Sequence, residues 1–191
     1  VLSQPSAVLA GNFRRTPYGL DRQSVYEPGD SKQKQGDHVV RLTVFGMGYL
    51  GLTHAVCMAE LGHEVLGVEV DQAKVAKLAN GEVPFYEPGL AGLLKKHLES
   101  GLLQITTSYQ DAADWGPLYF IAVGTPQKKG ESAADLRYVE AVIDGLAPLV
   151  RSDVLILGKS TVPVGTCAKL VERARALSTG GDIEIAWNPE F

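Results

Sequence analysis

The sequence predicts an α/β fold, in which a parallel β-sheet carries helices on both faces. Two observations predict this class. From Val39 onward, short apolar runs with many β-branched residues alternate with longer segments of helical periodicity. The first apolar run ends in the spacing Gly-x-Gly-x-x-Gly, at Gly46, Gly48 and Gly51. Because this spacing joins a strand to a helix in doubly wound sheets, we expect a Rossmann-type parallel sheet of about six strands.

The strand and helix segments can be placed in order along the chain. Strands are expected near residues 39–45, 64–68, 102–106, 118–123, 154–157 and 183–186. Helices are expected near residues 49–61, 71–79, 89–99, 135–149 and 166–177. Asp71 and Thr166 stand at two of the helix starts and are of residue types that cap helices, so each is predicted to be an N-cap. No element is assigned between residues 106 and 118.

The bulk composition argues against several classes of protein. The net charge is −4 and no apolar run approaches the ~20 residues that cross a bilayer, so neither nucleic acid nor a membrane is an expected partner. The two cysteines fit a reducing cytoplasm better than a disulfide scaffold. Residues 1–37 are polar and aperiodic and are predicted to be a flexible leader, followed by a folded domain at 38–191. The chain begins without Met and ends within a motif, so we expect a longer protein.

The carboxyl ends of the predicted strands are where an open α/β sheet binds its ligand. After the first strand, a glycine turn would hold a pyrophosphate against the free N–H groups of the next helix. This glycine turn consists of Gly46, Met47, Gly48, Tyr49, Leu50 and Gly51. Glu69 ends the second strand, about twenty residues later, where a carboxylate accepts ribose hydroxyls. Since Glu69 would repel a 2′-phosphate, the expected cofactor is NAD rather than NADP.

Each of these charged residues also has a plainer interpretation. Glu69 could be an exposed charge at a strand end, but its position favours cofactor binding. Asp71 is a competing carboxylate that fits better as a helix cap. Lys74 lies in the first turn of the second helix, where it could reach the ribose or the pyrophosphate or simply point into water. Both interpretations of Lys74 stay open at this point.

Three further strand ends carry hydroxyl and carboxylate groups. The fourth strand ends in residues 123–126, the fifth in residues 159–163 and the sixth in residues 188–190. In a parallel sheet these ends meet at one edge. A nicotinamide-dependent oxidation could use such a set of groups.

The cysteines and histidines indicate neither a nucleophile nor a metal site. Cys57 and Cys167 share helical faces with apolar residues and are predicted to be small core residues. The four histidines lack metal-ligand spacing, so no metal is expected. His97 stands at an otherwise polar helix end and is predicted to lie on the surface.

Five short motifs, taken together and in their order along the chain, are specific enough to indicate a protein family. They occupy residues 46–52, 81–90, 123–126, 159–166 and 188–191, and the last reads Asn-Pro-Glu-Phe. In content and order they resemble the N-terminal NAD-binding domain of the UDP-glucose/GDP-mannose dehydrogenase family, over residues 39–191. Within this family, the resemblance is greatest to the members that act on UDP-glucose.

The resemblance implies an enzyme that oxidises the 6-hydroxymethyl group of a nucleotide sugar to a carboxylate with two NAD. It implies NAD contacts from the glycine turn, Glu69, Lys74, Gly124, Thr125 and Thr161. Thr161 and Glu190 are implied to act near the reacting carbon, and Glu190 and Phe191 to contact the substrate. The family usually has Asp where this chain has Glu69, which is longer by one methylene.

The family's catalytic cysteine and lysine, much of its sugar-nucleotide site and its dimerisation helix belong to a later domain that this sequence does not contain. We therefore expect the 191-residue chain alone to bind NAD but not to oxidise UDP-glucose. The full-length protein is expected to be a cytoplasmic homo-oligomer. The same chemistry on GDP-mannose or a UDP-N-acetylhexosamine is an open alternative, and a non-catalytic nucleotide-binding module is an alternative of another class.

Overall fold

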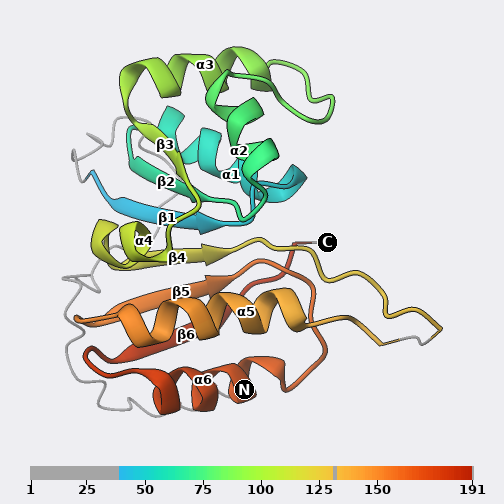
Figure 1. The fold of residues 1–191 in the computed structure, drawn as a ribbon, viewed down its shortest axis with the longest axis vertical. Helices are drawn as coiled ribbons and strands as arrows, with labels where there is room; N and C mark the ends of the chain where they lie inside the picture. Colours follow the sequence, from blue (N-terminus) through green and yellow to red (C-terminus); the bar gives the residue numbers. More distant parts are fainter. Residues whose placement is uncertain (1–38, 131–132, 191) are drawn as a thin grey trace, which may run out of the picture. The chain divides into compact units, whose positions relative to one another are not determined.

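The computed structural model describes residues 39–130 and 133–190, and the structural statements below refer to them. The predictions for the leader, residues 1–37, and for Phe191 lie outside these residues. One six-stranded parallel sheet organises the described part, with the order β3-β2-β1-β4-β5-β6 (Figure 1). The strands are Arg41–Phe45 (β1), Glu64–Val68 (β2), Leu103–Thr106 (β3), Leu118–Ile121 (β4), Val154–Gly158 (β5) and Ile183–Trp187 (β6). This confirms the predicted fold class.

The strand order reverses between β1 and β4, which fixes where a ligand can bind. Phe45 at the end of β1 is in register with Val68 of β2 and with Ile121 of β4. The carboxyl ends of these three central strands therefore lie together. In doubly wound sheets the crevice outside this switch point is the ligand site.

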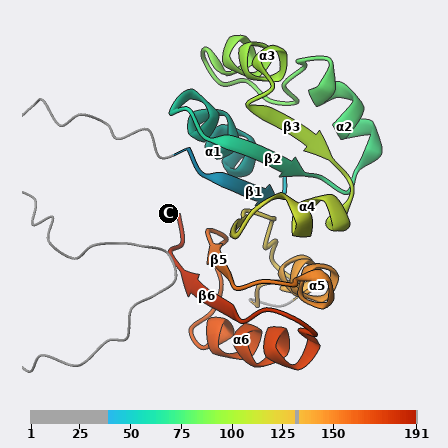
Figure 2. The same ribbon diagram turned by 90° about the vertical axis from the view of Figure 1, so that its left-hand side faces the viewer.

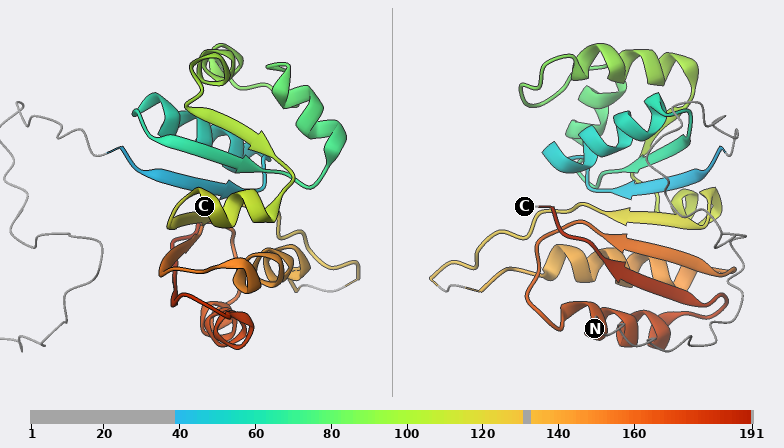
Figure 3. Two further views of the ribbon diagram at one scale, coloured as in Figure 1. Left: turned by 60° about the vertical axis from the view of Figure 1, so that its left-hand side comes forward. Right: turned by 180° about the vertical axis from the view of Figure 1, so that it is seen from behind.

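Helices cover both faces of the sheet (Figure 2). They are Tyr49–Glu60 (α1), Gln72–Ala79 (α2), Leu90–Ser100 (α3), Tyr109–Trp115 (α4), Arg137–Leu146 (α5) and Thr166–Leu177 (α6), with a 3₁₀ turn at Ala147–Leu149 after α5. The predicted helix at 135–149 is thus an α-helix of ten residues that tightens into this turn. Between β4 and α5 the chain projects beyond the strand ends, with Gln127 bridged to Ala134 (Figure 3).

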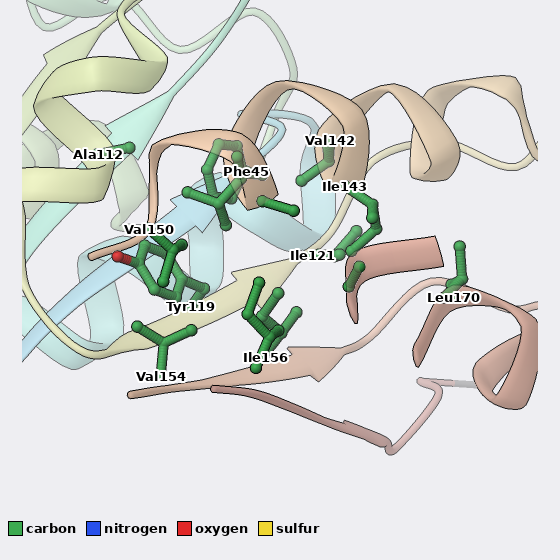
Figure 4. Packing of buried hydrophobic residues seen from close by; sticks show 14 of the residues in the cluster. Phe45, Ala112, Tyr119, Ile121, Val142, Ile143, Val150, Val154, Ile156 and Leu170 are labelled. Atoms are coloured by element: carbon green, nitrogen blue, oxygen red, sulfur yellow. The ribbon is translucent and has the colours of Figure 1, made fainter. Parts of the chain in front are cut away.

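Two apolar clusters hold the layers together. On one face, buried residues of β1, β2, β3 and β4 pack against α1, α2 and α3. On the other face, Phe45, Tyr119 and Ile156 pack against residues of α4, α5 and α6 (Figure 4). The alternation of inward side chains along each strand supplies both clusters, as the period of two in an extended chain requires. A sheet buried on both faces gives the strand ends a rigid base.

Helix α4 was not predicted from the sequence. It begins after Ser108, whose side-chain oxygen accepts a hydrogen bond from the N–H of Asp111 at 3.1 Å. Tyr109, its first residue, places its ring 5.3 Å from that of Phe45. Gly145 of α5 leaves room for this ring, since a Cβ there would lie 2.7 Å from it. At seven residues, α4 depends on this tertiary packing more than on local periodicity.

The two predicted helix caps have different outcomes. Asp71 is the N-cap of α2, and its carboxylate accepts hydrogen bonds from the N–H groups of Ala73 at 2.9 Å and Lys74 at 3.3 Å. The prediction for Thr166 was wrong. Gly165 is the N-cap of α6, with a φ of +85°, and Thr166 is the first helical residue. The left-handed backbone at Gly165 turns the chain into the helix without a capping side chain.

Two further predictions about single residues were wrong. Cys57 is exposed on α1, because the buried face of that helix consists of Leu52, Ala55, Val56 and Ala59 instead. His97 is 2% exposed, and its Nε2 lies 2.6 Å from the carboxylate of Glu60 on α1. That partner lies far away in the sequence, so the polar residues beside His97 concealed its burial.

The second cysteine, Cys167, is half-buried, with its Sγ 3.7 Å from the carbonyl oxygen of Ile185.

Within residues 39–130 and 133–190, no helix combines the length and the apolar character needed to cross a bilayer.

Candidate functional site

The glycine turn links the end of β1 to the start of α1. Gly46 has a φ of +92°, a conformation that favours glycine, and a Cβ there would lie 3.0 Å from the carbonyl oxygen of Ala122. A Cβ on Gly51 would overlap the carbonyl oxygen of Gly46, so α1 packs directly on the turn. Around Gly48, by contrast, a Cβ would meet no atom within 4 Å. The turn therefore needs glycine for packing at two positions and faces open space at the third.

The N-terminus of α1 suits an anion. Its N-cap, Gly48, provides no capping side chain, and the first turn contains no acidic residue. Leu52 closes the first helical hydrogen bond to the carbonyl oxygen of Gly48 at 2.9 Å, so the N–H groups before it lack helical partners. Unpaired N–H groups and the positive end of the helix dipole together form a site for a phosphate. This arrangement fits the pyrophosphate of a dinucleotide.

Glu69 lies immediately after β2, at the position predicted for it. It is 8% exposed, and its Oε2 accepts a hydrogen bond from the N–H of Met47 in the glycine turn at 3.2 Å. Its Oε1 accepts one from the N–H of Asp71 at 3.2 Å. Burial opposes ionisation of this carboxyl, but the ammonium of Lys74 and these backbone N–H groups outweigh it and hold the pKa of Glu69 below its ordinary value. Glu69 is thus an ionised acceptor fixed against the turn.

The sequence left open whether Lys74 reaches the cofactor site or points into water, and the structure excludes the second interpretation. Its Nζ lies 2.5 Å from Oε2 of Glu69, and its side chain is 25% exposed. Lys74 therefore does not simply point into water. Its ammonium forms an ion pair with the ionised glutamate and lies at the edge where a ribose or phosphate would bind.

The strand ends of β4, β5 and β6 are joined by hydrogen bonds. The hydroxyl of Thr125, after β4, donates to the carbonyl oxygen of Thr161 at 2.8 Å. The hydroxyl of Thr161, after β5, donates to the carbonyl oxygen of Glu190 at 3.3 Å. The three strand ends were expected to meet at one edge of the sheet, and these hydrogen bonds link Thr125, Thr161 and Glu190 there. Gly124 precedes this set and leaves space, since a Cβ there would meet only Pro126, at 3.9 Å.

Two residues that hold the backbone of these strand ends in place, Ser160 and Trp187, were not predicted from the sequence. Ser160 is buried, and its hydroxyl donates to the carbonyl oxygen of Val123 at 2.7 Å. The indole N–H of Trp187 donates to the carbonyl oxygen of Ser160 at 2.8 Å. A side chain on Gly158 would overlap the Trp187 ring. The only signal for these residues in the sequence was their position at strand ends.

A loop that the sequence analysis left without a role folds against the glycine turn. The hydroxyl of Tyr49 donates to Oε2 of Glu87 at 2.7 Å, and its ring lies 5.2 Å from that of Phe85. The hydroxyl bond to the carboxylate raises the pKa of Tyr49, so this phenol remains a donor at neutral pH. The loop of residues 81–89 is thereby held beside the start of α1.

Comparison with known proteins identifies the family to which this chain belongs. The model of the UDP-glucose/GDP-mannose dehydrogenase family, NAD binding domain, matches residues 40–191. The chain belongs to this family. Within the family, a UDP-glucose 6-dehydrogenase of Rhizobium meliloti is 38% identical over 152 residues, which cover 80% of this chain and 35% of that protein.

Solved structures of the dehydrogenase family agree in fold. A UDP-glucose dehydrogenase from Pyrobaculum islandicum matches with a TM-score of 0.76 and 38% identity, over 84% of this chain and 38% of that one. A GDP-mannose dehydrogenase from Pseudomonas aeruginosa matches with a TM-score of 0.75 and 34% identity, over 80% and 36%. The chain thus spans about a third of the length of these relatives and comprises the NAD-binding domain of the family.

Glu69 gives a test of cofactor choice in this dehydrogenase-family domain. Replacing Glu69 with Ala is expected to weaken NADH binding by the ~1.5–3 kcal/mol typical of hydrogen bonds to a charged group, which is about 10- to 150-fold. The preference for NADH over NADPH is expected to shrink as well, because the charge that repels a 2′-phosphate is removed. Calorimetric titration of both cofactors measures the two effects.

The matched control is Glu99→Ala, which removes an exposed carboxylate on α3. It is expected to leave both affinities unchanged. Equal or tighter binding of NADPH by the unaltered chain would contradict the role assigned to Glu69.

Proposed function

We propose that this chain is the cofactor-binding part of an enzyme that oxidises the 6-hydroxymethyl group of UDP-glucose to the carboxylate of UDP-glucuronate. The observation that carries the proposal is the hydrogen-bonded set Thr125, Thr161 and Glu190, which extends from β4 to β6 beside the glycine turn. A domain that only bound a nucleotide would need neither the second hydroxyl nor the carboxylate. When bound, NAD would accept the hydride.

The chain's own residues take distinct roles in this proposal. The N–H groups of the glycine turn and α1 hold the pyrophosphate, and Glu69 with Lys74 holds the ribose. Thr125 and Thr161 line the edge on which the nicotinamide would rest. Glu190 is 58% exposed at its side chain and can accept a proton from water in the hydrolytic step. Glu190 and Phe191 would contact the substrate.

The identity of the sugar nucleotide is the finer part of the proposal. Relatives named as UDP-glucose and as GDP-mannose dehydrogenases match this domain at similar identity. We favour UDP-glucose because of the motifs shared with that group, and GDP-mannose or a UDP-N-acetylhexosamine is the second candidate. Full-length relatives supply two thirds of their length outside this region, and the surface that selects the sugar would lie there.

The experiment uses the protein at the full length that its gene encodes. It is incubated with NAD and one nucleotide sugar at a time, and the NADH formed is measured against the sugar consumed. Two NADH per UDP-glucose, with little NADH from GDP-mannose, is the expected result. Faster oxidation of another sugar would shift the substrate assignment, and no oxidation of any of them would favour a non-catalytic nucleotide-binding module.

The 191-residue chain alone is expected to bind NADH but not to oxidise UDP-glucose, because one wall of the site would be missing. Misplacement of a reacting group by ~1 Å can already cost about a hundredfold in rate. The same NADH assay tests this. Turnover that disappears in Cys57→Ser or Cys167→Ser would contradict the proposal and identify a working cysteine within this domain.

A further inference from the structure

Among the described residues, Lys159 is the ionic partner of the Glu190 carboxylate, and its side chain is nearly buried. Nζ of Lys159 lies 2.9 Å from Oε2 of Glu190. The side chain of Lys159 is 13% exposed and that of Glu190 is 58% exposed. A lysine ammonium is seldom withdrawn from water to this extent unless it is paired. The position of Lys159 therefore calls for an explanation that an ordinary surface ion pair does not need.

The backbone places these two side chains next to each other. Beyond the last paired residues of β5 and β6, the N–H of Glu190 donates to the carbonyl oxygen of Lys159 at 3.1 Å. The hydroxyl of Thr161 donates to the carbonyl oxygen of Glu190 at 3.3 Å. These two bonds fix the backbone of Glu190 but leave its side chain free to rotate. Among the described residues, Lys159 makes the hydrogen bond that fixes the carboxylate itself.

We propose that Lys159 is a positioning residue for Glu190. Its ammonium binds one carboxylate oxygen, Oε2, and leaves the other oxygen exposed as a proton acceptor. The inference rests on the proposed function, in which Glu190 accepts a proton from water. Lys159 itself would touch neither water nor sugar in that step. Its role is to hold the acceptor in one orientation and in its ionised form.

The surroundings of Lys159 support this assignment. The titratable groups that act on Glu190 among the described residues are Lys159, which directly follows β5, and His54 on α1. The hydrogen bond and the charge of Lys159 hold the pKa of Glu190 below its ordinary value. Burial, and then the nearby ammonium, lower the pKa of His54 against the smaller opposing effect of Glu190. His54 is therefore neutral at neutral pH, so it does not repel the lysine.

His54 lies near enough to this ion pair for the charges of Lys159 and Glu190 to act on its pKa. Its ring lies 4.4 Å from that of Phe120, and its Nε2 is buried without a hydrogen-bond partner among the described residues. Because the side chain of Lys159 is nearly buried, water has little access to its ammonium from the protein side of the ion pair.

The first test measures Glu190 in the 191-residue chain, which needs no activity. The side-chain carboxyl carbon of Glu190 is followed by NMR as pH is varied, in the unaltered chain and in Lys159→Met, Lys159→Arg and Lys169→Met. In Lys159→Met the pKa is expected to rise toward the unperturbed value of about 4.3. Lys159→Arg is expected to preserve the low value. Lys169→Met removes an exposed lysine of α6 and is expected to change nothing.

The second test measures the pH dependence of turnover in the full-length protein. In Lys159→Met, the acidic limb of the plot of kcat against pH is expected to move to higher pH. The maximal kcat is expected to fall, while KM for the nucleotide sugar changes less than twofold. Lys159→Arg is expected to restore both. A Glu190 titration that is the same in Lys159→Met as in the unaltered chain overturns the proposal, whatever the enzyme does.

The kinetic outcomes separate the two proposals. If the titration shifts but the pH profile of an active enzyme does not, Lys159 has only a structural role and the positioning proposal is wrong. If Glu190→Gln keeps full activity, the proposed role of Glu190 fails, and the positioning proposal fails with it even where the ion pair is present.

Discussion

Replacing Gly51 by alanine is expected to destabilise the domain by about 3 kcal/mol or more and to weaken NADH binding at least tenfold, which is about 1.4 kcal/mol. The reason is the contact between α1 and the turn. A Cβ on Gly51 would overlap the carbonyl oxygen of Gly46, and a backbone atom cannot move aside as a flexible side chain can. Helix α1 must therefore shift away from β1, and the N–H groups that would hold the pyrophosphate shift with it. Urea unfolding and calorimetric titration with NADH measure the two effects.

Gly92 offers a matched control within another helix. It lies in α3, and a Cβ there would meet no atom within 4 Å. Gly92→Ala is expected to stabilise the domain by about 0.5–1 kcal/mol through helix propensity, without changing NADH affinity. A Gly51→Ala chain with unchanged stability and affinity would contradict the packing described for the turn.

Replacing Glu190 by glutamine in the full-length protein is expected to slow turnover by about 10²–10⁴-fold, the range for loss of a general base. The amide keeps the size of the side chain and can still accept a hydrogen bond from Lys159, but it cannot take a proton from water. NADH binding is expected to be unchanged, since Glu190 lies outside the pyrophosphate and ribose contacts. Steady-state measurement of NADH formation gives the rate, and titration with NADH gives the affinity.

Glu172→Gln is the matched control for this substitution, because Glu172 is an exposed carboxylate on α6. It is expected to keep the turnover of the unaltered enzyme. Retention of more than a tenth of that turnover in Glu190→Gln would show that another group takes the proton.

Local sequence patterns were sufficient to predict the features of the site that depend on neighbouring residues. The glycine turn follows from the spacing of Gly46, Gly48 and Gly51 after an apolar run, because each part of that motif is contiguous. The six strands follow from β-branched apolar runs, and the cap at Asp71 follows from its residue type. The position of Glu69 follows from counting along one strand–turn–helix–strand unit.

Contacts between distant segments could not be predicted in the same way. His97 is buried against Glu60 of α1, and Tyr49 is bonded to Glu87 of a loop; neither pair shares a local pattern. The link from Thr161 to Glu190 depends on how far the chain continues in register after β5 and β6. Helix α4 is short, and its stability comes from the packing of Tyr109 on Phe45 rather than from its own period.

Binding of NAD at the carboxyl ends of the strands can be tested by an NMR titration of the chain with NADH. Backbone amide signals are followed residue by residue as NADH is added. The largest shifts are expected at residues 46–51, at Glu69 and at residues 124–125, with no shift at Gly180 and Gly181, which precede β6 at the opposite edge of the sheet. Saturable shifts at Gly180 and Gly181 with the glycine turn unaffected, or no saturable shifts at all, would show that NAD does not bind at the carboxyl ends of the strands.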